Sequence, residues 1–112
     1  MIFEALNDAL ARGELILADG LMCRYHLRRD RVLTILEILA VPERRREGRA
    51  RAVLHRLRMA YRAAADRIRA KCPADLVEGN AFWQAMGFVL VRTEPGKRPV
   101  NVWEWEWPAD RT

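Results

Sequence analysis

The stretch LTILEILAVPERRREGRARAVL, Leu33–Leu54, joins two hydrophobic patterns of different period. Its first part belongs to an apolar run over 32–41 that Pro42 ends, and this run predicts a β-strand. With strict alternation, one face of the strand carries Leu33, Ile35, Glu37, Leu39 and Val41, and the other carries Leu36, Ile38 and Ala40. Because a strand that is apolar on both faces needs cover on both sides, we expect it at the centre of a sheet.

The second part of the stretch begins an amphipathic helix, predicted over about 49–65. Its apolar residues recur at helical intervals, at Ala50, Val53, Leu54, Leu57, Tyr61 and Ala64. Several arginines lie off this apolar stripe, so we expect the helix to pack one face on a core and to present a basic face to solvent.

The junction between the two patterns carries one glycine, Gly48, among arginines. The first turn of a helix has free N–H groups and a partial positive charge, so anions bind there. Gly48 lets an oxyanion approach the backbone closely, and Ala50 leaves that approach open. Arg45, Arg46 and Arg49 add positive charge. The segment therefore predicts a phosphate cradle, and the alternative is a helix start that happens to contain a glycine.

Three antiparallel strands are expected before this helix, at about 14–19, 21–28 and 32–41. Asp19–Gly20 stands between the first two, and this dipeptide is typical of a tight hairpin. A further helix is expected ahead of the strands over 2–11, with Gly13 as its C-terminal cap.

Downstream of the long helix, alternating apolar residues predict a strand at 67–72. A strand, a helix and a second strand in this order form a parallel, right-handed crossover. Asn80 is then expected to cap a short helix that Gly87 ends. The segments FVLVRT and NVWEWEW predict a C-terminal hairpin.

In the last predicted strand, Trp103, Trp105 and Trp107 fall on one face, and Glu104 and Glu106 fall on the other. So large an apolar patch seldom stays exposed, which predicts a core face with some contact to a second subunit. The two glutamates are expected in solvent.

Composition fits one α/β domain over 1–112, because the chain has 112 residues of which 51% are hydrophobic. It carries 20 Lys and Arg against 15 Asp and Glu, a formal net charge of +5. This balance favours an anionic partner such as a phosphate, a nucleic acid or a polyphosphate cofactor. The alternative is a solvated, arginine-rich surface.

The cysteine and hydropathy patterns disfavour several other classes of protein. Cys23 and Cys72 form no disulfide framework, and no cluster of histidine and cysteine indicates a metal site. We find no basic segment followed by an apolar core in residues 1–20, and no apolar run near the ~20 residues that cross a bilayer. The expectation is a reduced, cytoplasmic protein with no membrane partner.

The segment LAVPERRREGRARAVL resembles the coenzyme A motif of the GNAT superfamily, the acetyl-CoA-dependent N-acyltransferases. The family pattern is Arg or Gln, two residues, Gly, one residue, then Gly or Ala, and Arg45, Gly48 and Ala50 satisfy it. Downstream, FWQAMGF resembles the family's Phe-Tyr-x-x-x-Gly-Phe segment. The order of elements agrees as well: an antiparallel meander, a β-α-β crossover, a short helix and a C-terminal hairpin in one mixed sheet.

The resemblance implies acetyl-CoA as the cofactor. Its pyrophosphate would bind the backbone of Arg46, Glu47, Gly48, Arg49 and Ala50, with Arg45 beside it. Its pantetheine arm would follow the strand end at Leu39 and Val41, where this strand splays from the one at 67–72. The short helix that carries Asn80 and Trp83 would flank the thiol end.

Three departures from the family are visible. The family tyrosine, a candidate acid for the departing thiolate, is Trp83 here, and an indole cannot serve as that acid. Asn80 does not keep the family's distance from Gly87, so a helix cap is an alternative to a cofactor contact. The family's first strand and one early helix are missing, which leaves the acceptor side open or completed by a second chain in a homodimer.

Glu37 is the candidate catalytic base, because acyl transfer to an amine needs a group that removes a proton. Some GNAT enzymes place a glutamate on this strand. The alternative is a cross-strand ion pair, since Arg24 can lie opposite Glu37 in the predicted meander. His26 is a second candidate base on the same face, and a structural histidine is its alternative.

These observations predict an N-acetyltransferase that transfers an acetyl group from acetyl-CoA directly to an amine of a small molecule or a protein. One alternative is a GNAT-fold protein without catalysis that binds coenzyme A or regulates a partner. A basic nucleic-acid-binding protein is the weaker alternative, because the aromatic residues cluster at 82–107, away from the arginine run at 44–69.

Overall fold

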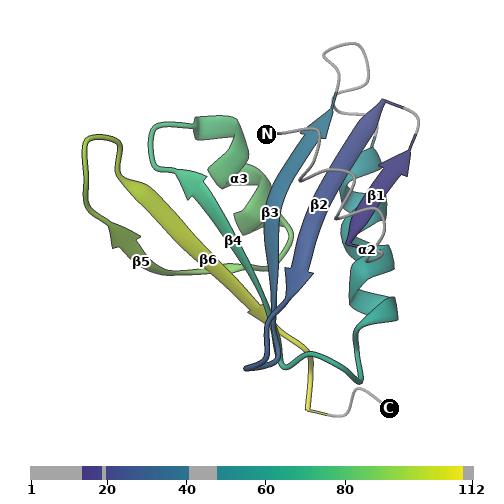
Figure 1. The fold of residues 1–112 in the computed structure, drawn as a ribbon. Coiled ribbons are helices and arrows are strands. Elements are labelled where there is room, and N and C mark those ends of the chain that lie inside the picture. The colour runs from purple at the N-terminus through teal and green to yellow at the C-terminus, as the bar shows by residue number, and fades with distance from the viewer. Residues whose placement is uncertain (1–13, 19, 41–47, 110–112) are drawn as a thin grey trace.

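The computed structural model describes residues 14–18, 20–40 and 48–109. The helix predicted over 2–11 with its cap Gly13 lies outside the described residues, and so does the segment 41–47. In chain order (Figure 1), the elements are β1 Leu15–Ala18, β2 Leu21–Leu27, β3 Val32–Ala40, α2 Arg49–Ala60, β4 Arg67–Pro73, α3 Val77–Ala85, β5 Val89–Glu94 and β6 Val100–Glu106.

The six strands form one mixed sheet in the order β1-β2-β3-β4-β6-β5. Strands β3 and β4 are parallel, and every other neighbouring pair is antiparallel. The predicted α/β class, with its meander, crossover, short helix and final hairpin, is therefore confirmed. The sequence pattern did not predict that β6 lies between β4 and β5.

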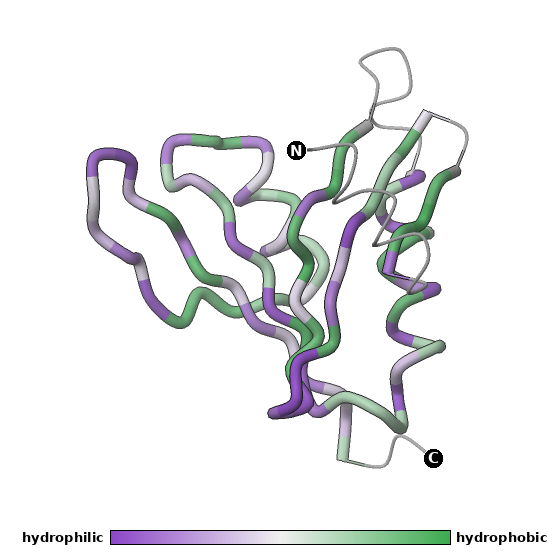
Figure 2. The backbone as a smooth tube through the Cα atoms, viewed as in Figure 1, coloured by the Kyte–Doolittle hydropathy of each residue, from purple (hydrophilic) through white to green (hydrophobic). Residues whose placement is uncertain are grey.

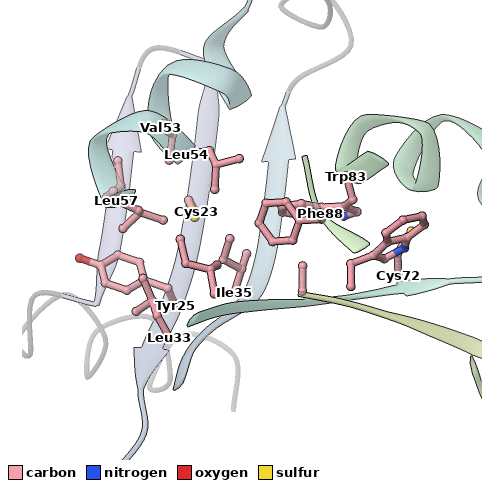
Figure 3. Close-up of a cluster of buried hydrophobic side chains, with 14 of the residues drawn as sticks. Cys23, Tyr25, Leu33, Ile35, Val53, Leu54, Leu57, Cys72, Trp83 and Phe88 are labelled. Carbon is pink, nitrogen blue, oxygen red and sulfur yellow. The ribbon is translucent and has the colours of Figure 1, made fainter. Parts of the chain in front are cut away.

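Both described helices pack on one face of the sheet, which we call the helix face. Val53, Leu54 and Leu57 of α2 and Trp83 of α3 belong to one buried cluster with strand residues such as Ile68. Figure 3 shows Val53, Leu54, Leu57 and Trp83 together with strand residues such as Ile35. Along α2 (Figure 2), hydrophilic and hydrophobic residues alternate as an amphipathic helix requires. We call the opposite side the open face, because neither described helix covers it.

A β-bulge at Leu36 changes the predicted faces of β3. Arg24 lies opposite Glu37 and Tyr25 lies opposite Ile35, so Leu36 is an extra residue in this pair of strands. The extra residue moves Glu37 to the open face, away from the buried Ile35. The prediction that Glu37 and Leu39 share a face with Leu33 and Ile35 is therefore wrong, because strict alternation fails across a bulge.

Strands β3 and β4 separate toward their carboxyl ends. Their pairing runs from Val32 opposite Arg67 to Ile35 opposite Ala70 and then stops, although both strands continue. Figure 1 shows the two strands diverging beyond this point. We call the space between them the splay, and it matches the splay that the family resemblance implies.

Helix α2 ends at Ala60, earlier than the predicted residue 65. The N–H groups of Ala64 and Ala65 both donate to the carbonyl oxygen of Tyr61, which closes a turn after the helix. The next N–H, that of Asp66, donates to the carbonyl oxygen of Arg31. The helix stops early because the chain turns here to bring β4 alongside β3.

Helix α3 begins at Val77, so Leu76 is its N-cap and Asn80 lies inside the helix. The prediction that Asn80 caps this helix is therefore wrong. Its predicted end is close to the observed one, because Gly87 has φ 87° and follows the last helical residue, Ala85, by two positions. The Phe88 N–H then donates to the carbonyl oxygen of Trp83, a bond typical of a glycine-ended helix.

Trp103 and Trp105 of β6 and the following Trp107 pack on the helix face, as predicted for a core. Trp103 is buried, and Trp105 and Trp107 are partly buried against the same cluster. Glu104 corrects the prediction that both glutamates are solvated, because its side chain is only 11% exposed. Glu106 stays 67% exposed, as the prediction requires.

Two arginines of β4 hold Glu104 on the open face. Its carboxylate accepts bonds from Arg69 Nε at 2.7 Å and Arg67 Nη1 at 3.2 Å. Burial raises the pKa of Glu104, but the hydrogen bonds and charges of Arg69 and Arg67 outweigh burial and keep the pKa below its ordinary value. The sequence missed this cluster because it depends on β4 lying beside β6.

Candidate cofactor and acceptor site

Helix α2 begins with an uncapped turn at Gly48. This residue has φ 75° and no side chain with which to cap the helix, and the first turn holds no acidic residue. A Cβ placed on Gly48 would meet no atom within 4 Å among the described residues other than its chain neighbours, so these residues leave the approach to the backbone open. The first N–H groups of a helix have no carbonyl partner within it, and they favour an anion. Ala50, the last residue of the motif, lies in this first turn.

The remaining motif residues belong to the segment 41–47. Val41, Arg45, Arg46 and Glu47 lie outside the described residues, so their cofactor roles stay predictions. The connection that contains them joins the end of β3 to the start of α2. The uncapped turn and the splay therefore lie at the same end of the sheet, the carboxyl end of its parallel strands.

The splay leaves one side of β3 without a strand partner. Beyond Ile35, the residues of β3 through Ala40 have no pairing to β4, so their backbone groups on that side are available to a ligand. Leu39, a predicted cofactor contact, lies in this part of the strand and is 59% exposed. An extended ligand can bind here by the backbone hydrogen bonds that β4 does not make.

Glu37 lies on the open face next to the splay. Arg24 is directly opposite, and its Nη2 lies 3.5 Å from Glu37 Oε1, so the predicted cross-strand ion pair is confirmed. The side chain of Glu37 remains 37% exposed, which leaves it accessible to a substrate. Its role as a base stays a prediction.

His26 shares the open face with Glu37, as predicted. It pairs with Thr34 in the strand register, and its Nδ1 lies 2.7 Å from Glu14 Oε1. Its side chain is half-exposed. The bond to Glu14 supports the structural alternative, while a catalytic role stays a prediction.

Asn80 joins three elements through its side-chain amide. Its Nδ2 donates to the carbonyl oxygens of Leu76 at 2.7 Å and Pro73 at 3.0 Å. Its Oδ1 accepts bonds from Trp103 Nε1 at 2.8 Å and Asn101 Nδ2 at 3.0 Å. Since protein groups occupy both ends of this amide, the geometry favours a structural role over the predicted cofactor contact.

Trp83 is part of the hydrophobic core. It is 4% exposed, and its ring lies in edge contact with Phe82 and Phe88 at 5.0 and 4.9 Å between centroids. The predicted contact between Trp83 and the cofactor stays untested, but the buried indole offers no acid to a thiolate.

The two cysteines are also buried and free. Burial raises the pKa of the Cys23 thiol to about 12 and also raises the pKa of Cys72. Both therefore remain protonated at neutral pH, which disfavours either as a nucleophile.

Sequence reasoning missed two features, one next to the site and one at the opposite end of α2. The first is the bulge at Leu36, although Thr34 and Glu37 gave a signal: two polar residues three apart cannot share a face of a regular strand. The second is Arg58, whose Nη2 donates to the carbonyl oxygen of Met86 at 2.6 Å and whose guanidinium lies 4.0 Å from the Trp105 ring. We find no signal in the sequence that distinguishes Arg58 from the other arginines of α2.

Two classes of site are absent from the part of the chain that the structure describes. Its histidine, cysteine, aspartate and glutamate residues nowhere gather in threes as metal ligands. None of its helices has the length and hydropathy that a membrane crossing requires.

Comparison with solved structures identifies the fold. A protein from Desulfovibrio desulfuricans described as an acetyltransferase of the GNAT family matches with a TM-score of 0.77, at 15% identity over 92% of this chain and 77% of that one. The ribosomal-protein-S18-alanine N-acetyltransferase of Escherichia coli matches with a TM-score of 0.69, at 14% identity over 88% and 75%.

A third structure contains the ligand that the sequence predicts. It is described as a streptothricin acetyltransferase from Bacillus anthracis in complex with acetyl coenzyme A, and it matches with a TM-score of 0.79 at 12% identity over 92% of this chain and 69% of that one. No protein-family model and no curated protein sequence matches the chain. At identities this low, these likenesses establish the fold and not the activity.

Proposed function

We propose that this chain, which has the GNAT fold, is an acetyl-CoA-dependent N-acetyltransferase. The observation that carries the proposal is the splay between β3 and β4, which opens at the same end of the sheet as the uncapped turn at Gly48. One site thus offers backbone N–H groups for phosphates and unpaired strand backbone for an extended arm. The streptothricin acetyltransferase of the same fold was solved with acetyl-CoA, which supports this cofactor.

The residues present fit coenzyme A. The open backbone from Gly48 to Ala50 would hold the pyrophosphate together with Arg46 and Glu47, and Arg45 would add charge. The backbone at Leu39 and Val41 would hold the pantetheine arm along the unpaired part of β3. These contacts are made by backbone groups. The motif therefore requires small side chains at Gly48 and Ala50 more strictly than it requires charged side chains around them.

When bound, acetyl-CoA supplies the acetyl group as a thioester. Glu37 accepts, directly or through water, the proton that the acceptor amine loses as the new C–N bond forms and the C–S bond breaks. Backbone N–H groups near the splay would stabilise the negative charge that develops on the carbonyl oxygen. The departing thiolate would take its proton from water or leave unprotonated, because the family's tyrosine is replaced by the buried Trp83.

Isothermal titration with acetyl-CoA, and separately with desulfo-coenzyme A, tests the proposal. We expect both to bind with micromolar affinity, because the phosphates and the pantetheine arm provide the contacts. No binding at millimolar ligand would reject the proposal. Binding without acetyl transfer across a broad panel of amines would instead support the catalytically inactive alternative.

The variant Gly48→Val tests whether the phosphates bind at the start of α2. We expect it to weaken binding of acetyl-CoA at least about tenfold, because the side chain blocks the backbone that the phosphates approach. Gly96→Val is the control, since Gly96 also has positive φ and open space around it but lies in the β5–β6 hairpin. Equal affinities for the two folded variants would place the phosphates elsewhere.

A further inference from the structure

The Arg24–Glu37 pair lies at the entrance to the splay on the open face. Glu37 is two residues beyond Ile35, the last residue of β3 that pairs with β4. The start of α2 and its phosphate cradle belong to a helix on the opposite face. A cofactor held from the helix face leaves the open face to the acceptor. The acceptor therefore passes Arg24 and Glu37 as it approaches the cofactor.

This ion pair is looser than the Arg69–Glu104 pair on the same face. The distance from Arg24 Nη2 to Glu37 Oε1 is 3.5 Å, and the two side chains are 24% and 37% exposed. Arg69 and Glu104 form a tight pair at 2.7 Å, with side chains 17% and 11% exposed. Both pairs join neighbouring strands, so the difference in length is not a matter of strand spacing.

The guanidinium of Arg24 also has donors to spare. An arginine has five N–H donors, and the bond to Glu37 uses one of them at a long distance. Its Nε is buried, so a ligand can reach only the terminal nitrogens Nη1 and Nη2 of this partly exposed side chain. These two nitrogens of the planar guanidinium are suited to bind a carboxylate through two parallel bonds.

We infer that Arg24 and Glu37 together bind an acceptor that carries a carboxylate beside its amine, that is, an α-amino acid. The inference rests on the proposed acetyltransferase function and names the substrate class of that same site. Arg24 binds the carboxylate, and Glu37 receives the amino group whose proton it takes. When the zwitterion binds, the long pair between Arg24 and Glu37 gives way to two shorter pairs. One joins the carboxylate to Arg24, and the other joins the amino group to Glu37.

Other charges around the splay agree with this class. Lys71 follows Ala70, the last paired residue of β4, and its Nζ bonds Glu94 at 3.1 Å. The entrance thus carries cations on both strands, Arg24 beside β3 and Lys71 on β4, with Glu37 between them. This arrangement favours an acceptor with one amine and one carboxylate over a polyamine, whose several positive charges would meet Arg24 and Lys71.

The test is calorimetric titration of the coenzyme A-saturated protein with each of the twenty amino acids, and with the matching amide and decarboxylated amine of each. We expect one or more amino acids to bind at least about tenfold more tightly than their partners without a carboxylate, the loss expected for a hydrogen bond to a charged group. Equal binding of amino acids and amides, or no binding by any amino acid, would overturn the inference.

Variants at Arg24 sharpen the test. Arg24→Gln is expected to abolish the preference for a carboxylate while leaving coenzyme A binding and thermal unfolding nearly unchanged, and Arg24→Lys is expected to restore part of it. Arg28→Gln is the control, because Arg28 also forms an exposed ion pair, with Asp30 at 3.1 Å, but lies at the far end of β2. A preference that survives Arg24→Gln would assign Arg24 a structural role only.

The two proposals fail in different ways. A wild-type protein that binds no coenzyme A overturns the proposed function and, with it, the acceptor assignment. A protein that binds coenzyme A and acetylates amines without regard to a carboxylate keeps the function and overturns the acceptor assignment alone. Acetylation confined to peptide N-termini would also keep the function and overturn the acceptor assignment, since a peptide carries no carboxylate next to its amine.

Discussion

At the scale of single residues, the face on which Glu37 lies depends on the one-residue bulge at Leu36. Leu36 is the extra residue in the pairing of β2 with β3, and without it Glu37 would point with Ile35 into the helix-face core. An unpaired carboxylate is costly in such a core. The bulge therefore places a charged side chain on the open face while it keeps the buried side of β3 apolar.

Replacing Glu37 by glutamine tests its chemical role. Glutamine keeps the shape of the side chain but accepts no proton, so we expect the turnover rate to fall about 100-fold while acetyl-CoA still binds. The measurement is the rate of thiol release with a saturating amine, beside a titration with acetyl-CoA. A wild-type rate would remove Glu37 from the mechanism and leave His26 as the remaining candidate base.

Arg58 links the last turn of α2 to Met86, the C-cap residue of α3. Its guanidinium donates to the carbonyl oxygen of Met86 and lies over the rings of Trp105 and Phe88, at 4.0 and 5.5 Å from their centroids. Its own carbonyl oxygen accepts a bond from Trp107 Nε1 at 2.9 Å. Burial lowers the pKa of Arg58, so its partners must offset a real cost of desolvation.

We expect Arg58→Met to lower the free energy of unfolding by about 2 kcal/mol, from the lost hydrogen bond to a charged group and the lost contacts with the rings. Chemical denaturation measures this change. Arg56→Met is the control, because Arg56 is exposed on the same helix. Equal stability of the two variants would mean that methionine packs as well as the arginine does.

At the scale of elements, β4 and β6 are joined by charge on the open face and by apolar packing on the helix face. Arg67 and Arg69 of β4 bind Glu104 of β6, while Ala70 lies opposite the buried Trp103. The alternation of β6 supplies both surfaces at once, since successive side chains of a strand point to opposite faces.

The β4–β6 charge cluster predicts a loss of stability in acid. Because the pKa of Glu104 is lowered in the folded state, its stabilising contribution is complete above its ordinary value of 4.5 and disappears as the pH falls through the folded value. We expect the free energy of unfolding to fall below about pH 4.5, and to fall less in Glu104→Gln. Denaturant titrations from pH 3 to 7 measure this.

The control for Glu104 lies two residues away on the same face. Glu106→Gln alters a carboxylate that is 67% exposed and 3.5 Å from Arg67 Nη2. We expect this variant to keep the wild-type dependence on pH. Identical pH profiles for the wild type and Glu104→Gln would contradict the assignment of acid sensitivity to Glu104.

At the scale of the whole molecule, the positive charge is less available than the formal net charge of +5 suggests. On the sheet and its loops, many cations are paired with carboxylates: Arg24, Arg28, Arg31, Arg67, Arg69, Lys71, Arg92 and Arg98. Pairing removes much of the attraction that a nucleic acid would feel for such a surface.

We therefore expect weak binding to single-stranded DNA and RNA at physiological salt, with a dissociation constant no tighter than the ~10⁻⁴–10⁻⁶ M typical of non-specific binding. Fluorescence anisotropy with labelled oligonucleotides at several salt concentrations measures this. Nanomolar affinity with a steep dependence on salt would contradict the expectation and would favour the nucleic-acid-binding alternative.

The sequence by itself determined the elements of this fold. Alternation marked the strands, helical spacing marked α2, and the glycines at 48 and 87 marked the start of one helix and the end of another. These signals are local, because each depends on residues within a few positions of one another. The resemblance to the coenzyme A motif is likewise local, because it rests on one short segment, and the cofactor roles of its residues stay predictions.

Tertiary structure alone decided how the elements meet. The insertion of β6 beside β4 gave Glu104 its arginine partners, and the contacts of α3 with β4 and β6 occupied Asn80. The bulge at Leu36 set the face of Glu37 by a register between strands, which no short window of sequence records. Such features depend on pairs of residues far apart in the chain, so they are fixed only when the whole sheet has assembled.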